Sequence, residues 1–197
     1  MGLKVKHMRN TRTKDLIFEA FVELVNEKDF EKITIQNVTV QARINRATFY
    51  SHFQDKYEFL EKSTMDSAIE LIHGQTGGIC VFTEEKIRKL VHVVFKYHQQ
   101  VKTNCHRSYK SITPLLRKQM IQALQSYFNS CLHHMCVDDF TFYSQMYSTM
   151  IYDAVNLRLT EQTSLSEAEI ADKMVHLIGS SRPFIVDSQT PLIGQEH

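Results

Sequence analysis

The sequence predicts an all-α protein, in which an N-terminal three-helix helix-turn-helix domain is joined to a larger helical domain. Three observations support this class. Only 6 glycines and 3 prolines occur in 197 residues, whereas β-proteins need many turns built from those residues. Apolar residues recur with helical spacing along most of the chain. Residues 13–53 divide into three short segments of this kind, and the last two are separated by a tight break.

The first predicted element is an amphipathic helix over residues 13–28. Its apolar residues follow the i, i+3, i+4, i+7, i+8 pattern, and they are Ile17, Ala20, Phe21, Leu24 and Val25. Thr34 is a good N-cap for a second, short helix that reaches Ala42. Asn45 is a good N-cap for a third helix over residues 46–53, directly after the break at residues 43–44.

The remaining elements are also predicted to be helical. Lys56 starts a fourth helix that runs toward Leu71, and the glycines within residues 74–78 mark a flexible break. Further helices are predicted over residues 83–102, from near Pro114 to about residue 135, and over residues 140–160.

The last predicted helix has the clearest start signal, because Ser166 is followed three residues later by Glu169, as in a capping box. Gly179 is its expected C-cap. Asp138 and Asp139 are expected to cap the helix over residues 140–160. The tail shows no periodicity and is predicted to be disordered. The predicted domains are residues 1–62, residues 63–180 and the tail at residues 181–197.

Charge and composition exclude some classes of protein. The net charge is +1, so a globally basic nucleic-acid binder is not indicated. The first 14 residues nevertheless carry cations and no acid, namely Lys4, Lys6, Arg9, Arg12 and Lys14. This arm either follows phosphates or is simply a solvated terminus. No signal peptide and no apolar stretch of about 18–20 residues is present. The 4 cysteines are scattered, and we expect a cytoplasmic protein with reduced thiols and no membrane association.

The third helix has the chemistry of a recognition helix. Phe49 and Phe53 define its buried side, so Ala47 and Ser51 point away from the core. Arg46 lies in the first turn, from where a long side chain reaches forward. Such polar, cationic and small side chains suit base edges and phosphates in a major groove. The alternative is an ordinary surface helix of an all-α protein.

The segment at residues 34–56 closely resembles the DNA-binding signature of the TetR family, most specifically at residues 46–50 and 52–60. The resemblance covers about residues 10–62 and implies contacts to DNA by position. The implied DNA-binding residues are Thr34, Gln36, Arg43, Asn45, Arg46, Ala47, Thr48, Tyr50, Ser51, His52 and Lys56. Among these, Thr34 and Gln36 resemble the family's positions that contact the DNA backbone. His52 and Lys56 resemble its positions that bind a DNA phosphate at the start of the fourth helix. Arg43 departs from the family, whose members usually have glycine in the turn.

The resemblance also implies partners: a palindromic double-stranded DNA operator, a second copy of the chain, and a small-molecule effector that releases the DNA. The expected activity is repression, and a co-activator type of family member is the alternative. The last two helices would form the homodimer, because the segment at residues 140–160 is apolar on several sides. The expected dimerisation residues are Met150, Ile151, Ala154, Leu157, Ile170, Met174, Leu177 and Ile178. The alternative is a buried monomer core.

Residues that could line an effector pocket are aromatic or Met residues, which are more often plain core. They are Tyr97, Tyr109, Tyr127, Tyr143, Met146, Tyr147 and Met150. An all-α enzyme is not expected, because no nucleophile motif, acid–base pair or phosphate loop appears. The cluster of Cys131, His133, His134 and Cys136 has no familiar zinc spacing, so neither a metal nor a cofactor is expected.

Overall fold

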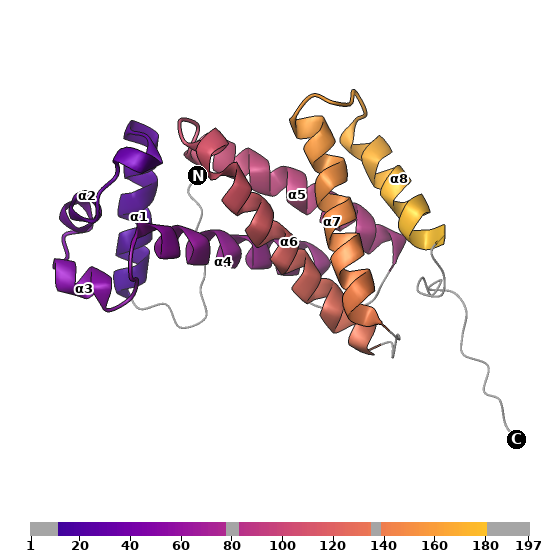
Figure 1. Cartoon of the computed structure of the whole chain (residues 1–197), viewed down its shortest axis with the longest axis horizontal. Helices are drawn as coiled ribbons and strands as arrows, with labels where there is room; N and C mark the ends of the chain where they lie inside the picture. Colours follow the sequence, from indigo (N-terminus) through magenta and orange to yellow (C-terminus); the bar gives the residue numbers. More distant parts are fainter. Residues whose placement is uncertain (1–11, 78–82, 135–138, 181–197) are drawn as a thin grey trace, which may run out of the picture. The chain divides into compact units, whose positions relative to one another are not determined.

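The computed structural model describes residues 12–77, 83–134 and 139–180. Within these ranges the chain forms α-helices and one short 3-10 helix, η1, and no strand, which confirms the predicted all-α class. In chain order the elements are α1 (Arg12–Glu27), η1 (Phe30–Lys32), α2 (Ile35–Gln41), α3 (Arg46–Tyr50), α4 (Lys56–Thr76), α5 (Glu84–Asn104), α6 (Tyr109–His134), α7 (Phe140–Leu159) and α8 (Glu167–Ser180) (Figure 1). None of the helices in the described ranges is long and apolar enough to cross a membrane.

The chain divides into two compact units. The described part of the first unit contains α1 to α3 together with α4 up to Leu71 and the segment from Lys96 to Ala123 of α5 and α6. The second unit contains α7 and α8 together with the remaining parts of α4, α5 and α6. Each of the three long middle helices therefore contributes residues to both units.

The first unit is built around an aromatic core. α1 packs on α2, and α2 packs on α3. The ring of Phe59, from α4, has its centroid 4.9 Å from that of Phe21 in α1 and 5.0 Å from that of Phe53. Phe21 also meets Phe30 of η1 with 5.9 Å between ring centroids. Because all four rings are nearly inaccessible to solvent, they join α1, η1, the chain after α3, and α4 into one core.

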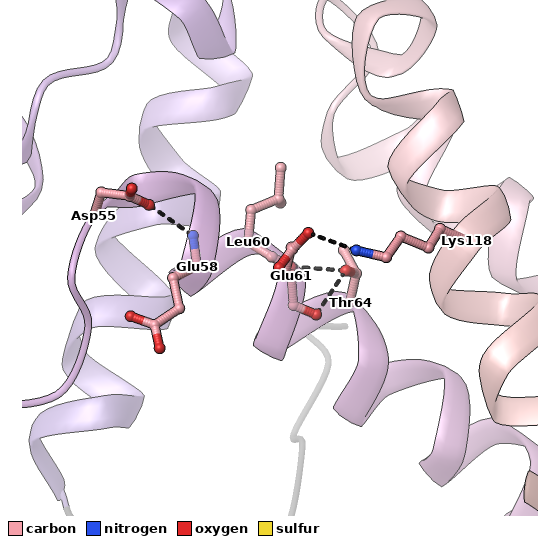
Figure 2. A network of polar contacts seen from close by, with 6 residues as sticks. All are labelled: Asp55, Glu58, Leu60, Glu61, Thr64 and Lys118. Atoms are coloured by element: carbon pink, nitrogen blue, oxygen red, sulfur yellow. Dashed lines mark hydrogen bonds and ion pairs between the residues drawn. The ribbon is translucent and has the colours of Figure 1, made fainter.

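Polar contacts within the first unit attach parts of α5 and α6 to α4. Tyr97 of α5 donates its hydroxyl proton to the carbonyl of Thr64 over 3.3 Å. Figure 2 shows a second attachment, in which the ammonium of Lys118 in α6 lies 3.2 Å from the carboxylate of Glu61 in α4. The Thr64 hydroxyl donates to the carbonyl of Leu60 over 2.7 Å, with the Glu61 carbonyl at 3.1 Å, so its own polar group is satisfied within α4 (Figure 2).

In the second unit, α7 and α8 pack on each other. Ile151 and Val155 of α7 and Ile170 and Ile178 of α8 are buried there. On the surface of this unit, α5 is joined to the α8 region by an ion pair between Arg88 and Asp172 and by a contact of 2.7 Å between His92 and Glu167.

Three predicted caps are confirmed. Thr34 accepts a hydrogen bond from the backbone N–H of Asn37, and Asn45 accepts one from the N–H of Ala47. At the start of α8, the N–H of Glu169 donates to the hydroxyl of Ser166 over 3.3 Å, while the Glu169 carboxylate accepts from the N–H of Ser166 over 2.8 Å. Short-range signals of this kind operate within four residues and are readable from sequence.

The capping role expected of Asp139 is wrong, because its side chain makes no cap hydrogen bond and its φ is 55°. Asp138 and the predicted tail lie outside the described residues.

Two glycines lie in places that differ from the prediction. Gly74 lies inside α4, which continues to Thr76, and Gly179 lies inside α8 rather than after it. A glycine within a helix lowers helix stability by only about 1 kcal/mol relative to alanine. The packing of neighbouring residues offsets this cost, so the helix continues through the glycine.

Two further helix boundaries differ from the prediction. α6 begins at Tyr109, before Pro114, so the proline lies within the helix instead of at its first turn. α3 ends at Tyr50 rather than at Phe53. Phe53 is buried all the same, because the chain after α3 folds back against Phe59.

Candidate nucleic-acid interface

The candidate interface includes the N-terminal end of α2. The Thr34 hydroxyl accepts from the N–H of Asn37 over 3.1 Å, and the Asn37 side chain accepts from the N–H of Thr34 over 3.0 Å. This reciprocal capping box holds the first turn of α2 without help from the rest of the chain. Both Thr34 and Gln36 are exposed at this helix end. The two residues predicted to contact the DNA backbone are therefore accessible.

The turn between α2 and α3 has a left-handed residue at Arg43, with φ of 55°. The N–H of Arg43 donates to the carbonyl of Val40 over 3.2 Å, and the N–H of Ile44 donates to that of Thr39 over 3.0 Å. These two bonds define a Schellman motif, which usually has glycine at the left-handed position. Arg43 therefore adopts the turn geometry that glycine would favour, and its exposed side chain adds a cation beside α3.

Helix α3, the predicted recognition helix, is short and anchored at both ends. Asn45 accepts from the N–H of Ala47 over 2.9 Å at its start. Phe49 is fully buried on its inner side and lies 5.7 Å from Phe53, centroid to centroid. The Ser51 hydroxyl donates to the carbonyl of Thr48 over 2.7 Å at its end. The buried ring and the two terminal bonds set which residues of the helix face outward.

The outward face of α3 carries a preorganised cation. Arg46, Ala47 and Tyr50 are exposed, and Thr48 is half-buried beside them. The guanidinium of Arg46 donates to the hydroxyl of Tyr50 over 3.3 Å and lies 5.6 Å from the centroid of its ring. This i, i+4 contact limits the conformations of a long side chain before it meets a ligand.

The side chain of Lys56 has bonding partners that the sequence did not predict. Its ammonium lies 3.0 Å from each of three backbone carbonyl oxygens, those of Phe30, Glu31 and Ile33. An ammonium has three N–H donors, so all of them can be used within the protein. His52, the other residue predicted to bind a phosphate there, is half-buried. The phosphate role of Lys56 stays a prediction, and these internal bonds compete with it.

Arg107 and Ser108 also bind the connection between α1 and α2, and the sequence did not predict either contact. Arg107 donates to the carbonyl of Glu27 over 2.8 Å. The hydroxyl of buried Ser108 accepts from the N–H of Phe30 over 2.6 Å. Ser108 and Phe30 are 78 positions apart, and no local pattern in the sequence signals such a contact.

The residues predicted to line an effector pocket fall into both compact units. Tyr97 and Tyr109 belong to the first unit, and the others belong to the second. Tyr97 is buried, while Tyr109 is half-buried and lies 2.8 Å, hydroxyl to Nδ1, from the buried His98. Burial lowers the pKa of His98 from 6.5 to about 4 and raises that of Tyr109. Both side chains are therefore neutral near pH 7 and suit an uncharged hydrogen-bonding environment.

In the second unit, the predicted pocket residues differ in accessibility. Tyr127 and Tyr147 are buried, whereas Met146 is 45 % exposed. The ring of Tyr147 contacts two other aromatic rings, with its centroid 5.8 Å from that of Phe128 and 5.9 Å from that of Tyr143.

The predicted dimerisation residues divide by burial. Four of them are buried within a single chain, namely Ile151, Ile170, Met174 and Ile178. Leu157 and Leu177 are 44 % and 51 % exposed, and Met150 and Ala154 are half-buried. The buried residues hold α7 against α8, and the exposed residues remain accessible on these helices.

The Cys131–Cys136 region is only partly described, because Cys136 and the side chain of His134 lie outside the described residues. The basic residues up to Arg9 lie outside them as well. Among the residues that the structure does describe, no group of three or more His, Cys, Asp or Glu is placed to hold a metal ion. Cys131 is buried in α6.

Comparison with known proteins finds a family that matches the segment containing these helices. Residues 17–62 match the family described as bacterial regulatory proteins, tetR family. The chain is 38% identical over 65 residues to the uncharacterized HTH-type transcriptional regulator YxbF of Bacillus subtilis. The aligned part is 32% of this chain and spans 17% of that relative's length.

Solved structures share the fold over most of the chain. The TetR family repressor AlkX of Dietzia sp., implicated in biodegradation of n-alkanes, is 14% identical with a TM-score of 0.57, covering 89% of this chain and 97% of AlkX. The dihydroxyacetone kinase operon activator DhaS is 15% identical with a TM-score of 0.56, covering 86% of this chain and 96% of DhaS. Residues 17–62 are thus a helix-turn-helix domain of the tetR family of bacterial regulatory proteins, and the described chain has the all-α fold of TetR-family regulators.

Proposed function

We propose that the chain is a homodimeric transcriptional regulator that binds a palindromic DNA operator through α3 and is released by a small-molecule effector. The observation that carries the proposal is the outward face of α3. A buried Phe49 fixes the helix, and the guanidinium of Arg46 lies over the ring of Tyr50 and donates to its hydroxyl. This face supports the proposal, because the major groove admits an α-helix and presents acceptors and donors that cationic and polar side chains can bind.

The roles of individual side chains follow from their chemistry. Arg46 suits the O6 and N7 acceptors of guanine, and the methyl groups of Ala47 and Thr48 suit thymine. The remaining polar or cationic residues suit the sugar–phosphate backbone, which sets the register of a protein on DNA. These are Thr34, Gln36, Arg43, Asn45, Tyr50, Ser51 and His52. Lys56 is not in this set, because its donors are used within the protein.

A second copy of the chain is the proposed occupant of an apolar stripe on α7. Phe142, Met146 and Leu157 are each at least 44 % exposed and recur at spacings that place them on one side of the helix. Leu177 adds an exposed apolar side chain from α8, which packs on α7. A palindromic site needs two recognition helices about 34–36 Å apart, so a dimer through these helices is consistent with operator binding.

Effector binding is proposed for the helical part beyond the helix-turn-helix, where neutral polar groups such as His98 and Tyr109 lie among apolar side chains. We propose repression as the direction of control. The fold is compatible with either direction, because AlkX is named a repressor and DhaS an activator. In a reporter assay with the selected operator, expression that rises when the regulator is deleted supports repression, and expression that falls supports the co-activator alternative.

The DNA-binding proposal is tested by selecting sites from a random double-stranded DNA library with the full chain. The expected result is an enriched palindrome, with Arg46→Ala relaxing the preference for a base in each half-site. Lys62→Ala is the matched control, because it removes a surface cation from α4 that is paired with Glu58. A library without any enriched palindrome would refute operator binding. Sedimentation tests the dimer, and the double variant Leu157→Arg with Leu177→Arg is expected to be monomeric.

A further inference from the structure

The ammonium of Lys56 joins the two ends of the helix-turn-helix. Its three acceptors lie in the connection before α2, and the last of them, Ile33, directly precedes the N-cap Thr34. Lys56 itself is the first residue of α4, directly after the chain that leaves α3. The bonds at 3.0 Å to Phe30, Glu31 and Ile33 therefore connect the entrance of α2 with the exit of α3. We call Lys56 and these three carbonyls the clasp.

Aromatic rings and a carboxylate surround the clasp. The ammonium lies 4.6 Å from the ring centroid of the buried Phe30 and 5.3 Å from that of Tyr57. The hydroxyl of Tyr57 donates to the carboxylate of Glu31 over 3.0 Å, which ties the same two segments a second time. Carbonyl dipoles and ring faces both attract a cation, so the site is built for an ammonium that stays in place.

The N-terminus of α4, where a phosphate would otherwise find free N–H groups, is also satisfied from within. The carboxylate of Asp55 accepts from the N–H groups of Tyr57 and Glu58, each over 2.8 Å. Figure 2 shows the bond to Glu58. Because a carboxylate already caps this helix end, an approaching phosphate meets a negative charge there rather than open donors.

We propose that Lys56 is a positioning residue for DNA binding: its ammonium closes the helix-turn-helix on itself and does not contact phosphate. The proposal rests on the proposed function in that its effect on DNA binding requires that the chain binds DNA. Closing residues 34–55 between Ile33 and Lys56 restricts how far α2 and α3 can move relative to the start of α4. DNA then meets a recognition helix already in place, so less ordering accompanies binding.

The clasp and a phosphate contact differ in their salt dependence. Each phosphate contact contributes about 0.9 to the slope of log K against log salt concentration. Lys56→Met removes the donors but retains most of the apolar stem. The clasp predicts that this variant binds operator at least about tenfold more weakly with an unchanged slope. A phosphate contact predicts a slope shallower by about 0.9 for each protomer.

Charge-retaining and control variants sharpen the test. Lys56→Arg keeps the cation, but its planar guanidinium cannot direct three donors from one nitrogen to three carbonyls. The clasp therefore predicts that it binds nearly as weakly as Lys56→Met, whereas a phosphate contact predicts affinity near that of the unaltered protein. Lys32→Ala removes the same charge from the same connection, where Lys32 is exposed and pairs with Asp29, and is expected to leave affinity almost unchanged.

Two measurements on the DNA-free full chain test the clasp independently of DNA binding. A ¹H–¹⁵N spectrum of lysine ammonium groups should show one slowly exchanging signal that is absent in Lys56→Met. Amide hydrogen exchange at residues 34–53 should be faster in Lys56→Met than in Lys32→Ala. An absent signal, or equal exchange in the two variants, overturns the clasp, as does the shallower salt slope. If no DNA site is found at all, the proposed function fails, while these two measurements still decide the clasp.

Discussion

Arg43→Gly should raise the free energy of unfolding of the protein and lower its affinity for operator DNA. A left-handed conformation costs a non-glycine residue about 1–2 kcal/mol, and Arg43 has φ of 55° in the Schellman turn. Glycine removes that strain but adds backbone freedom to the unfolded chain, which costs about 0.5–1 kcal/mol. The expected net gain is roughly 0.5–1 kcal/mol in the free energy of unfolding, or about 1–4 °C in Tm for a chain of this size.

A matched turn elsewhere in the chain provides the control. Glu161 has φ of 60° at the end of α7, where its N–H donates to the carbonyl of Arg158 and that of Gln162 donates to the carbonyl of Leu157. Glu161→Gly should therefore give a similar gain in stability without changing DNA binding. Arg43→Gly should also make the salt slope of operator binding shallower by about 0.9 per protomer, if Arg43 contacts phosphate.

Urea unfolding of the DNA-free protein and titrations of labelled operator at several salt concentrations measure these effects. If Arg43→Gly lowers the free energy of unfolding while Glu161→Gly raises it, the Arg43 side chain stabilises the fold and the strain argument is wrong. If the salt slope does not change, Arg43 has no phosphate contact.

Further expectations concern the caps, the recognition helix and a buried histidine. Thr34→Ala should lower the free energy of unfolding by about 1 kcal/mol, measured in urea, and Thr34→Ser should restore most of it. Arg46→Ala should lose about 1–3 kcal/mol of discrimination at one base pair in each half-site; equal weakening on all single-base operator variants would contradict direct readout. Because burial lowers the pKa of His98 to about 4, the unfolded chain binds the proton more readily. Stability from this group is complete above about pH 6.5 and is lost as the pH falls from 6.5 toward 4, by roughly 3 kcal/mol in all. The difference in unfolding free energy between the unaltered protein and His98→Gln should therefore shift by this amount over that range, and a constant difference would show that His98 titrates normally.

Local signals in the sequence predicted much of the fold. The capping residues Thr34, Asn45 and Ser166 are correct because a cap bonds to a backbone group two or three positions away. The stripe from Ile17 to Val25 is buried as its spacing predicts. Helix ends without such a signal were predicted less well. α4 passes through Gly74, since the packing of neighbours such as Ala68 and Ile72 outweighs a small local cost.

The sequence by itself determined the helical class, the starts of α2 and α3 and the outward residues of α3, because each depends on periodicity or on bonds within one turn of helix. Only the tertiary structure decided what Lys56 and Ser108 bind, since their partners lie 23 to 26 and 78 positions away. A lysine at the start of a helix looks the same in sequence whether it faces phosphate or three carbonyls. Its role depends on where the folded chain brings the connection before α2, and the packing of Phe21, Phe30 and Phe59 sets that place.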